Sequence, residues 1–222
     1  MSNLLFDPIK TQARVTDSVI VGFSGGKDSI VTLDLCFKYF KRVVPFYMYF
    51  VPDLEFQERT MRWYENKYNT EIIRIPHFEN SRMLRYGTYN MFESKDVGVV
   101  GINDIYEYLR QKTGIYWIAA GERCADSIVR NAMIKKSGSV DYQRGRFYPI
   151  AYWNKKEVHE YIKYKKLYLS PEQKKLDYSA GGLSGAELYI IREMYPKDYE
   201  KILKVFPLAG VAVKHYEEYE KV

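Results

Sequence analysis

The side chains best suited to chemistry stand together in one six-residue stretch, Ser24-Gly-Gly-Lys-Asp-Ser29. Its two serine hydroxyls can donate hydrogen bonds, its lysine carries positive charge, and its paired glycines let the backbone turn with no Cβ in the way. Backbone N–H groups at the start of a helix that follows such a turn form an anion site. The stretch therefore predicts a loop that binds a phosphate or a sulfate.

The flanking residues predict a strand before this loop and a helix after it. Residues 19–21 are apolar and β-branched, which is typical of a buried parallel strand. Apolar residues recur at helical spacing from Ile30 to Phe40. Two common phosphate loops are excluded by spacing. A Walker A loop needs serine or threonine where Asp28 stands, and the three glycines of a dinucleotide fingerprint are missing.

Strands and helices alternate in the sequence that follows. Three apolar segments predict strands and one amphipathic segment predicts a helix: 43–51, 71–76 and 116–120 for the strands, and 56–68 for the helix. This alternation predicts an α/β fold with a parallel sheet that helices cover on both faces. Such sheets bind ligands at the carboxyl ends of their strands. Ser24, Asp53 and His77 each follow a strand, so we expect them near the ligand.

A second junction of strand, glycine and helix follows the fourth predicted strand. It begins at Gly121, and its helix is predicted to continue to about Lys136. Arg123 stands where a guanidinium can bind an anion through two nitrogen atoms. Ser127 and Arg130 are three residues apart and therefore share one side of the helix. An ordinary polar helix start is the alternative, and the place at the end of a central strand favours the anion site.

The composition fits an intracellular protein with an anionic ligand. The 222 residues are 46% hydrophobic, which suits one α/β domain with a small appendage. No apolar run is long enough to cross a membrane, and we expect no signal peptide and a cytoplasmic location. Cys36 and Cys124 are too few for a disulfide framework or a four-cysteine metal site. The net charge of +6 suits an anionic ligand and leaves nucleic acid open.

Tyrosine is frequent, and several of the 22 tyrosines stand beside lysines, as in residues 161–168. Such tyrosines either stack on nucleic-acid bases or pack at helix edges, and packing is the commoner use.

These motifs resemble those of a known superfamily. Ser24–Ser29 matches SGGxDS, the pyrophosphate loop (PP-loop) of the adenine nucleotide alpha-hydrolases. The second junction matches the G-x-R-x-x-x-S-x-x-R element of the sulfonucleotide (PAPS) reductases at Gly121, Arg123, Ser127 and Arg130. Pro149–Trp153 and the helix after it are similar as well, so the resemblance covers about residues 17–165. The chain is identified as a PAPS reductase-like member of this superfamily, of a kind often seen in phages and mobile elements.

The resemblance implies a Rossmann-like (HUP-type) fold with a parallel five-stranded sheet, helices on both faces and a helical C-terminal extension. It implies a nucleotide-binding domain over residues 1–165 and an extension over 166–222 that packs on the same domain. The implied ligand is ATP or PAPS/APS with Mg²⁺, and Asp28 is the implied metal ligand. The implied catalytic residues are Lys27, Asp28 and Arg123. The implied nucleotide- and phosphate-binding residues are Ser24, Gly25, Gly26, Lys27, Asp28, Ser29, Gly121, Arg123, Ser127 and Arg130, and the base or substrate contacts are Asp53, Phe56 and His77.

The chain departs from the reductases in two places. Val51-Pro-Asp53 replaces their Asp-Thr-Gly turn, so we expect base or substrate recognition to differ, although Phe56 and Glu58 of the following Phe-x-Glu are kept. The reductases attack sulfur with a cysteine near the C-terminus, and some add a cysteine-bound iron–sulfur cluster, whereas no cysteine follows Cys124. Because a thiolate nucleophile needs a cysteine within reach, we expect neither unaided PAPS reduction nor an iron–sulfur cluster.

Three functions stay open at this point. The first is an enzyme in which a second substrate attacks the α-phosphorus of ATP and pyrophosphate leaves. The second is binding or reduction of a sulfonucleotide with a partner's thiol, and the third is a non-catalytic nucleotide-sensing regulatory or assembly protein. Transfer-RNA thiolation is disfavoured because CxxC pairs are missing. The partners are an adenine nucleotide, an unidentified second substrate and a protein that is ParB-like or donates a thiol. Nucleic acid is weakly indicated, and no membrane is expected.

Two further regions are interpreted from local signals. Residues 79–112 predict a loop or lid that carries Arg82 and Arg85, with a helix from Asp104. In the C-terminal part, Ser184 and Glu187 form a capping box at the start of a helix, and further helices follow. The preceding Gly181-Gly182 pair either closes over the nucleotide or joins two helices.

Overall fold

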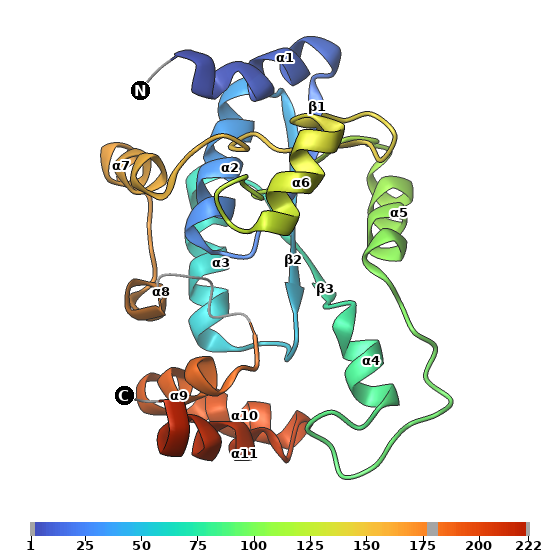
Figure 1. The fold of residues 1–222 in the computed structure, drawn as a ribbon, viewed down its shortest axis with the longest axis vertical. Helices are drawn as coiled ribbons and strands as arrows, with labels where there is room; N and C mark the ends of the chain where they lie inside the picture. Colours follow the sequence, from blue (N-terminus) through green and yellow to red (C-terminus); the bar gives the residue numbers. More distant parts are fainter. Residues whose placement is uncertain (1–2, 177–181, 221–222) are drawn as a thin grey trace.

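A six-stranded sheet lies at the centre of the part of the chain that the computed structural model describes, residues 3–176 and 182–220 (Figure 1). The strand order is β3-β2-β1-β4-β6-β5. Neighbouring strands run parallel except at one edge, where β5 pairs antiparallel with β6. The strands are β1 Ser18–Gly22, β2 Arg42–Tyr49, β3 Ile73–Pro76, β4 Ile118–Ala119, β5 Val140–Asp141 and β6 Arg146–Phe147.

The predicted α/β class is confirmed, and the predicted five strands are corrected to six in the described residues. Five strands are parallel, as expected. The additional strand, β5, has two residues and forms a short hairpin with β6, in which Val140 lies opposite Phe147. A strand of two residues is too short to show an alternating pattern, so periodicity cannot reveal it.

The apolar residues of β1 alternate between the two faces of the sheet. Val19 and Val21 pack in one core cluster with Leu33 of the helix α2 (Lys27–Tyr39), whereas Ile20 packs in another with Leu109 of the helix α5 (Ile102–Thr113). Because both faces bury apolar side chains, the strand appears in the sequence as one continuous apolar run.

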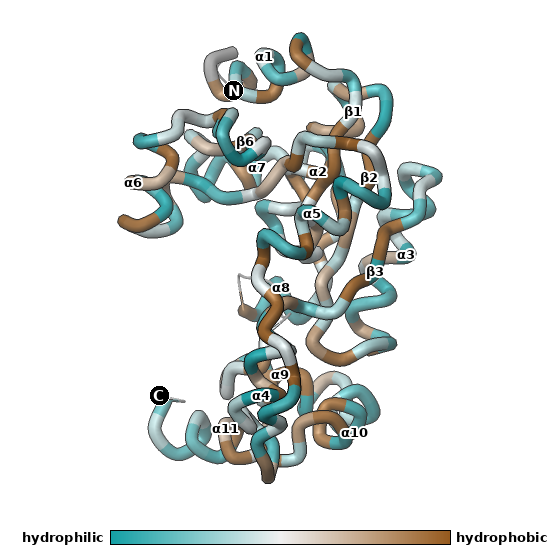
Figure 2. The backbone as a smooth tube through the Cα atoms, turned by 90° about the vertical axis from the view of Figure 1, so that its right-hand side faces the viewer, coloured by the Kyte–Doolittle hydropathy of each residue, from teal (hydrophilic) through white to brown (hydrophobic). Residues whose placement is uncertain are grey.

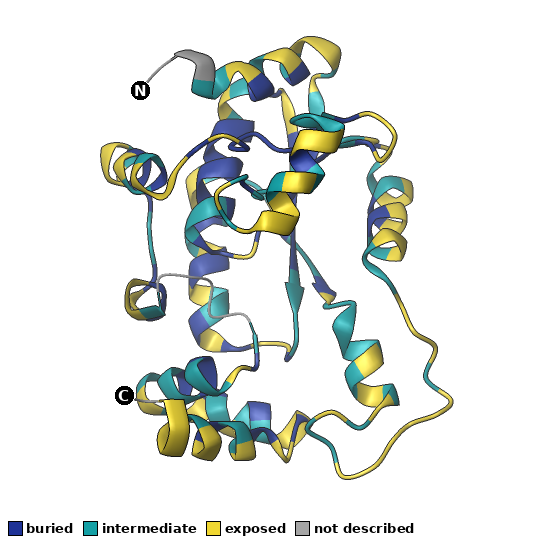
Figure 3. Cartoon of the chain, viewed as in Figure 1, coloured by how far each residue is buried: buried dark blue, intermediate teal, exposed yellow. Residues whose placement is uncertain are grey.

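Helices cover both faces, as predicted. The first core cluster draws on α1 Asp7–Val15, α2 Lys27–Tyr39, α3 Glu55–Tyr68 and α7 Lys155–Lys165, and the opposite face carries α5 Ile102–Thr113. A further helix, α6 Ile128–Ser137, buries Ile134 against Tyr148 just after β6. Figure 3 shows these helices with buried inner sides and exposed outer sides. None of the described helices is both long and apolar enough to cross a lipid bilayer.

The C-terminal helices form a separate apolar cluster with residues that follow β2. Leu188, Ile202 and Phe206 pack there with Val51 and Phe56. Figures 1 and 2 both place these helices at the lower end of the molecule, below the sheet. The helices of this part are α8 Pro171–Leu176, α9 Gly185–Met194, α10 Pro196–Val205 and α11 Ala209–His215, and the short helical turns η1 Asn3–Phe6 and η2 Tyr216–Glu220 lie near the two ends of the chain.

The region predicted as a loop or lid is an excursion between β3 and α5. It contains the helix α4 Glu79–Arg85 and the connection 86–101. Tyr89 ties it to the C-terminal helices, because its hydroxyl donates to the carbonyl of Leu183 at 3.0 Å and its carbonyl accepts from the N–H of Leu208 at 2.9 Å. Arg85 binds the carbonyl of Val97 within the excursion. The helix α5 begins at Ile102, two residues before the predicted start.

Candidate functional site

The glycine loop joins the end of β1 to the start of α2, where the sequence predicts it. The hydroxyl of Ser29 accepts the N–H of Ser24 at 3.2 Å and donates to the carbonyl of Gly26 at 2.9 Å. The N–H of Gly26 points to the hydroxyl of Ser24 at 3.3 Å. These bonds close the loop on itself, with Gly25 in the left-handed conformation (φ 72°) that glycine adopts without strain.

A residue outside the sequence motif also holds this loop. Gln173 of α8 is buried, and its side-chain amide donates to the carbonyl of Gly25. The C=O and N–H of a trans peptide point in opposite directions. Anchoring this carbonyl on α8 therefore directs the N–H of Gly26 into the loop. The sequence offers no local signal for this contact, because 148 residues separate the two partners.

The second predicted junction lies directly against the loop. Gly121 follows β4, and a Cβ added to it would stand 3.2 Å from the backbone carbon of Asp28 and 3.2 Å from the nitrogen of Ser29. Real Cβ atoms rarely stand this close to other atoms, so glycine at this position eases the close approach of the two backbone segments. The junction is not helical from its start, however. The helix α6 begins at Ile128, and Ser127 is its N-cap, whose hydroxyl accepts the N–H of Arg130 at 3.2 Å.

Arg123 is buried between two carboxylates. Its Nε lies 2.9 Å from Oδ1 of Asp28, and one terminal nitrogen lies 2.7 Å from Oδ1 of Asp126. Only 6% of its side chain is exposed, whereas 51% of Arg130 is. Arg130 pairs with the same Asp126, with one terminal nitrogen 3.2 Å from Oδ2. Of the two predicted anion-binding arginines, Arg130 is therefore the accessible one, and Arg123 links the glycine loop to the second junction.

Burial raises the pKa of Asp28, and the positive charges of Arg123 and Lys27 oppose that rise. Its second carboxylate oxygen lies 3.5 Å from Nζ of Lys27. Among the described residues, no group of three histidine, cysteine or acidic side chains is arranged to hold a metal ion. The Asp28 carboxylate is paired with Arg123 and Lys27, so a Mg²⁺ ion would have to share it with these cations and take its other ligands from the nucleotide phosphates and water. The metal role of Asp28 stays a prediction.

The loop and the junction open onto a pocket of about 540 Å³. Eight predicted site residues line it: Ser24, Gly26, Lys27, Asp28, Ser29, His77, Gly121 and Arg130. Apolar side chains of β2 and the segment after it form one wall, including Phe46, Met48 and Phe50. The cations Lys27 and Arg130 line the pocket together with four carboxylates: Asp28, Glu122, Asp126 and Glu187. The backbone N–H groups of a helix start beside an apolar wall suit the phosphates and the base of a nucleotide.

His77 lines the pocket and stacks on Phe50, with ring centroids 4.3 Å apart. Burial lowers its pKa, and its Nδ1 accepts the N–H of Glu79 at 3.2 Å. The ring is therefore uncharged at neutral pH and extends the apolar wall.

Two predicted base or substrate contacts lie elsewhere. Asp53 is exposed in the turn after β2, where its carbonyl accepts Nζ of Lys201. Phe56 is buried against Tyr195 of the C-terminal cluster, with ring centroids 5.2 Å apart. Neither side chain lines the pocket. Their roles as base or substrate contacts therefore stay predictions.

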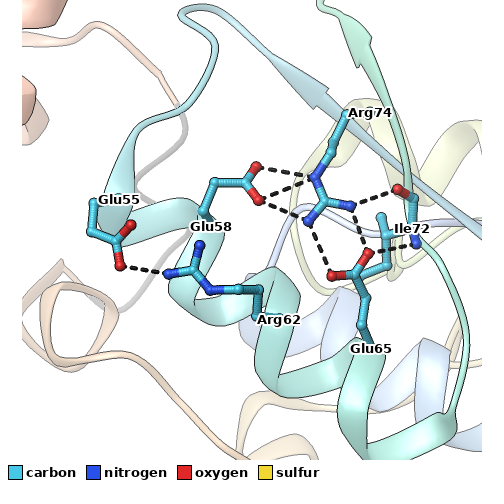
Figure 4. Close-up of polar contacts among 6 residues, drawn as sticks. All are labelled: Glu55, Glu58, Arg62, Glu65, Ile72 and Arg74. Carbon is cyan, nitrogen blue, oxygen red and sulfur yellow. Dashed lines mark hydrogen bonds and ion pairs between the residues drawn. The ribbon is translucent and has the colours of Figure 1, made fainter.

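Glu58, which completes the Phe-x-Glu, binds an arginine rather than facing the pocket. Figure 4 shows the guanidinium of Arg74 between the carboxylates of Glu58 and Glu65, at 2.7 and 2.6 Å. Arg74 also donates to the carbonyl of Ile72, and Glu65 accepts the N–H of that residue. These bonds join α3 to β3, so the motif has a structural use here.

Sequence reasoning did not place Glu122 and Glu187 in the pocket, whereas Gly182 belongs to the glycine pair for which it left a place over the nucleotide open. Glu122 lies at the second junction and pairs with Arg146 at 2.8 Å. Gly182 and Glu187 come from the C-terminal part, and Glu187 accepts the N–H groups of Gly182 and Ser184. The predicted capping box of Ser184 and Glu187 is confirmed, but its position against the pocket is a tertiary feature. Gly181 lies outside the described residues, so the prediction for the glycine pair stays open.

Comparison with known proteins identifies the family. The model of the phosphoadenosine phosphosulfate reductase domain matches residues 18–174, so the chain belongs to that family. This confirms the resemblance to PAPS reductase-like members of the PP-loop superfamily. Direct comparison with curated protein sequences finds no significant match.

Two solved structures are similar at low identity. An NH3-dependent NAD synthetase from Campylobacter jejuni is 14% identical with a TM-score of 0.48, over 96% of this chain and 92% of that one. The U34-tRNA thiolase NcsA from Methanococcus maripaludis, with its [4Fe-4S] cluster, is 16% identical with a TM-score of 0.45, over 93% of this chain and 78% of that one. We draw no functional conclusion from likenesses this distant.

Proposed function

We propose that the chain binds an adenine nucleotide in the 540 Å³ pocket and transfers the adenylyl group of ATP to a second substrate. The observation that carries the proposal is the glycine loop at the start of α2, which opens onto this pocket beside Lys27 and Arg130. Backbone N–H groups, serine hydroxyls and these cations would hold the β- and γ-phosphates. The apolar walls would take the base.

In the proposed reaction, a nucleophilic oxygen or nitrogen of the second substrate forms a bond to the α-phosphorus. The bond from that phosphorus to the bridging oxygen breaks, and pyrophosphate leaves with the electron pair. Lys27 and Arg130 would stabilise the negative charge that develops on the leaving group. Arg123 would act by holding Asp28 and Asp126 in place, so we propose it as a positioning residue.

The two cysteines favour adenylyl transfer over reduction by this chain alone. Burial raises the pKa of the Cys36 thiol, which is fully enclosed in the core. Cys124 packs against Ala120 and Tyr148 and does not line the pocket. A sulfonucleotide bound in the same pocket, with a thiol from a partner, is the second candidate, because the family model is named for that substrate.

A thermal-shift experiment separates the candidates. The purified protein is heated with Mg²⁺ and, in turn, ATP, dATP, AMP, APS or PAPS. A ligand at 100 times its dissociation constant adds about 2.7 kcal/mol, or about 5 to 11 °C for a chain of this size. A shift with ATP, followed by pyrophosphate release when candidate second substrates are added, is expected. A shift with PAPS but not ATP would overturn adenylyl transfer, and no shift with any of them would overturn nucleotide binding.

The double variant Ser24→Ala with Asp28→Ala is the control for the site. We expect it to lose the nucleotide shift and keep a cooperative melting transition. Unchanged affinity would remove the glycine loop from the proposal.

A further inference from the structure

A band of positive and aromatic side chains runs along the outer face of α3, away from the residues used so far. Arg59, Trp63 and Lys67 stand at positions i, i+4 and i+8 and therefore share one side of the helix. Arg59 and Lys67 are exposed, and Trp63 is half-buried. Lys67 lies over the ring of Trp63, with Nζ 5.6 Å from its centroid. The helix thus presents an aromatic ring between two cations.

The end of α7 continues this band. Tyr168 stacks on Trp63 with ring centroids 5.7 Å apart, and its carbonyl accepts the hydroxyl of Tyr64 at 2.7 Å. Lys163 and Lys166, which precede Tyr168 in the chain, are exposed. With the exposed Tyr164, which stands between the two lysines, we call these residues of α3 and of the end of α7 the α3–α7 strip: Arg59, Trp63, Lys67, Lys163, Tyr164, Lys166 and Tyr168. Beyond Tyr168, α8 adds the exposed Lys174 and Lys175.

The carboxylates of α3 do not neutralise the strip. Glu58 and Glu65 are both bound to Arg74, and Glu55 is bound to Arg62 at 2.5 Å (Figure 4). Within residues 3–176 and 182–220, no ion pair joins the six strip and α8 cations to a carboxylate: Arg59, Lys67, Lys163, Lys166, Lys174 and Lys175. Uncompensated surface cations attract a polyanion.

The tyrosines of residues 161–168 divide between packing and exposure. Tyr161 is buried and donates to Asp34 at 2.7 Å, so its role is structural. Tyr164 is 79% exposed, and Tyr168 stacks on Trp63 at the surface. Packing explains Tyr161 fully and Tyr168 in part, because Tyr168 is partly buried against the core, and it leaves Tyr164 exposed. Tyr164 and Tyr168, beside Lys163 and Lys166, match the pattern of aromatic stacking surfaces among positive charges.

We propose that the α3–α7 strip binds single-stranded nucleic acid. The lysines and Arg59 would contact successive phosphates, and Trp63, Tyr164 and Tyr168 would stack on unpaired bases. Helix-exposed aromatic rings are accessible to splayed bases and not to the stacked bases of a duplex, so the strip should prefer single strands. This proposal does not depend on the nucleotide chemistry proposed above, because no strip residue lines the pocket.

The test is fluorescence anisotropy with labelled oligouridylate of about 20 nucleotides, longer than the roughly 4 to 16 that one small domain covers. The strip variant replaces Lys163, Lys166, Lys174 and Lys175 with alanine. The matched control replaces four exposed lysines elsewhere and has the same net charge: Lys135, Lys136, Lys197 and Lys204. We expect the strip variant to bind at least about tenfold more weakly than the control. The slope of log K against log salt should become shallower by about 0.7 for each phosphate that the variant no longer neutralises.

Tryptophan fluorescence tests the stacking. The chain has three tryptophans, and Trp153 is buried. We expect oligouridylate to quench the emission, and the quenching to disappear in Trp63→Phe. Heparin fragments, which carry negative charge and no bases, should bind more weakly and leave the emission unchanged. The proposal is overturned if heparin or duplex RNA binds as tightly as the single strand, or if the strip and control variants weaken binding equally.

Two cross-checks keep this proposal separate from the proposed function. The strip variant should keep the thermal shift with ATP, and the Ser24→Ala and Asp28→Ala variant should keep oligonucleotide binding. If that loop variant loses oligonucleotide binding and the strip variant keeps it, the nucleic acid binds in the pocket, and the proposal for the strip is wrong.

Discussion

Replacing Gly121 with alanine tests whether the close approach of the two junctions shapes the phosphate site. The added Cβ would stand 3.2 Å from two backbone atoms of Asp28 and Ser29 and 3.3 Å from a third. Backbone atoms at a helix start cannot rotate away as a flexible side chain does. The start of α2 must therefore move by a few tenths of an ångström, and with it the N–H groups that face the pocket.

The expected cost follows from overpacking a close contact, which destabilises by about 1 to 3 kcal/mol. For a chain of this size that corresponds to a fall in melting temperature of about 2 to 12 °C. The assay is a melting curve of Gly121→Ala with and without ATP and Mg²⁺. We expect a lower melting temperature and a nucleotide shift that is smaller than in the wild type.

The matched control is Gly98→Ala, because a Cβ added to Gly98 meets nothing within 4 Å. It should melt and bind as the wild type does. If Gly121→Ala has the same melting temperature as the control and keeps the full nucleotide shift, the reasoning is refuted. A lower melting temperature with full nucleotide affinity would show that Gly121 packs the two junctions without shaping the phosphate site.

Three further substitutions probe individual contacts. Arg123→Ala removes the buried guanidinium between Asp28 and Asp126 and leaves Asp28 with only Lys27 at 3.5 Å. It should lower the free energy of unfolding by about 3 to 5 kcal/mol in urea titrations. A change below about 1 kcal/mol, on the order of an exposed pair, would contradict this. Gln173→Leu removes the donor to the loop carbonyl, so we expect weaker ATP binding by isothermal titration at similar stability, and an unchanged dissociation constant would rule out positioning. Hydrogen bonds from Arg74 lower the pKa of Glu65 below its ordinary 4.5. Their stabilisation is therefore present above pH 4.5 and is lost as the pH falls through the lowered pKa. We expect the urea midpoint of Glu65→Gln to vary less with pH than that of the wild type between pH 3 and 6, about the range over which carboxyl groups titrate, and an equal pH dependence of the two proteins would contradict this.

The parts predicted well from sequence are those that local pattern determines. A glycine loop between a β-branched strand and an amphipathic helix has one arrangement, because the strand must be buried and the helix must start where the glycines end. Ser127 and the capping box of Ser184 are local in the same sense, although the sequence placed Ser127 inside the helix rather than at its cap. A hydrogen bond between residues three apart in the sequence leaves a recognisable local pattern, whereas the bond between Gln173 and Gly25, which are 148 residues apart, leaves none.

What the sequence could not show is where the C-terminal helices pack. The family motif suggests Phe56 as a ligand contact, yet its ring is buried against Tyr195 from the last fifth of the chain. The same helices bring Glu187 to the pocket and hold Tyr89 of the excursion. This packing turns the Phe56 ring toward the C-terminal cluster and supplies Glu187 as part of the pocket lining. The C-terminal helices, which lie beyond the family match at residue 174, are therefore where we expect this chain's second-substrate specificity to differ from that of its family. Exchanging Glu187 for glutamine, which keeps the size of the side chain and removes its charge, is the direct measurement. If the affinity for the nucleotide is unchanged while turnover with a second substrate changes, the part of the pocket lined by the C-terminal helices selects that substrate. If affinity and turnover are both unchanged, the charge of Glu187 has no part in that selection.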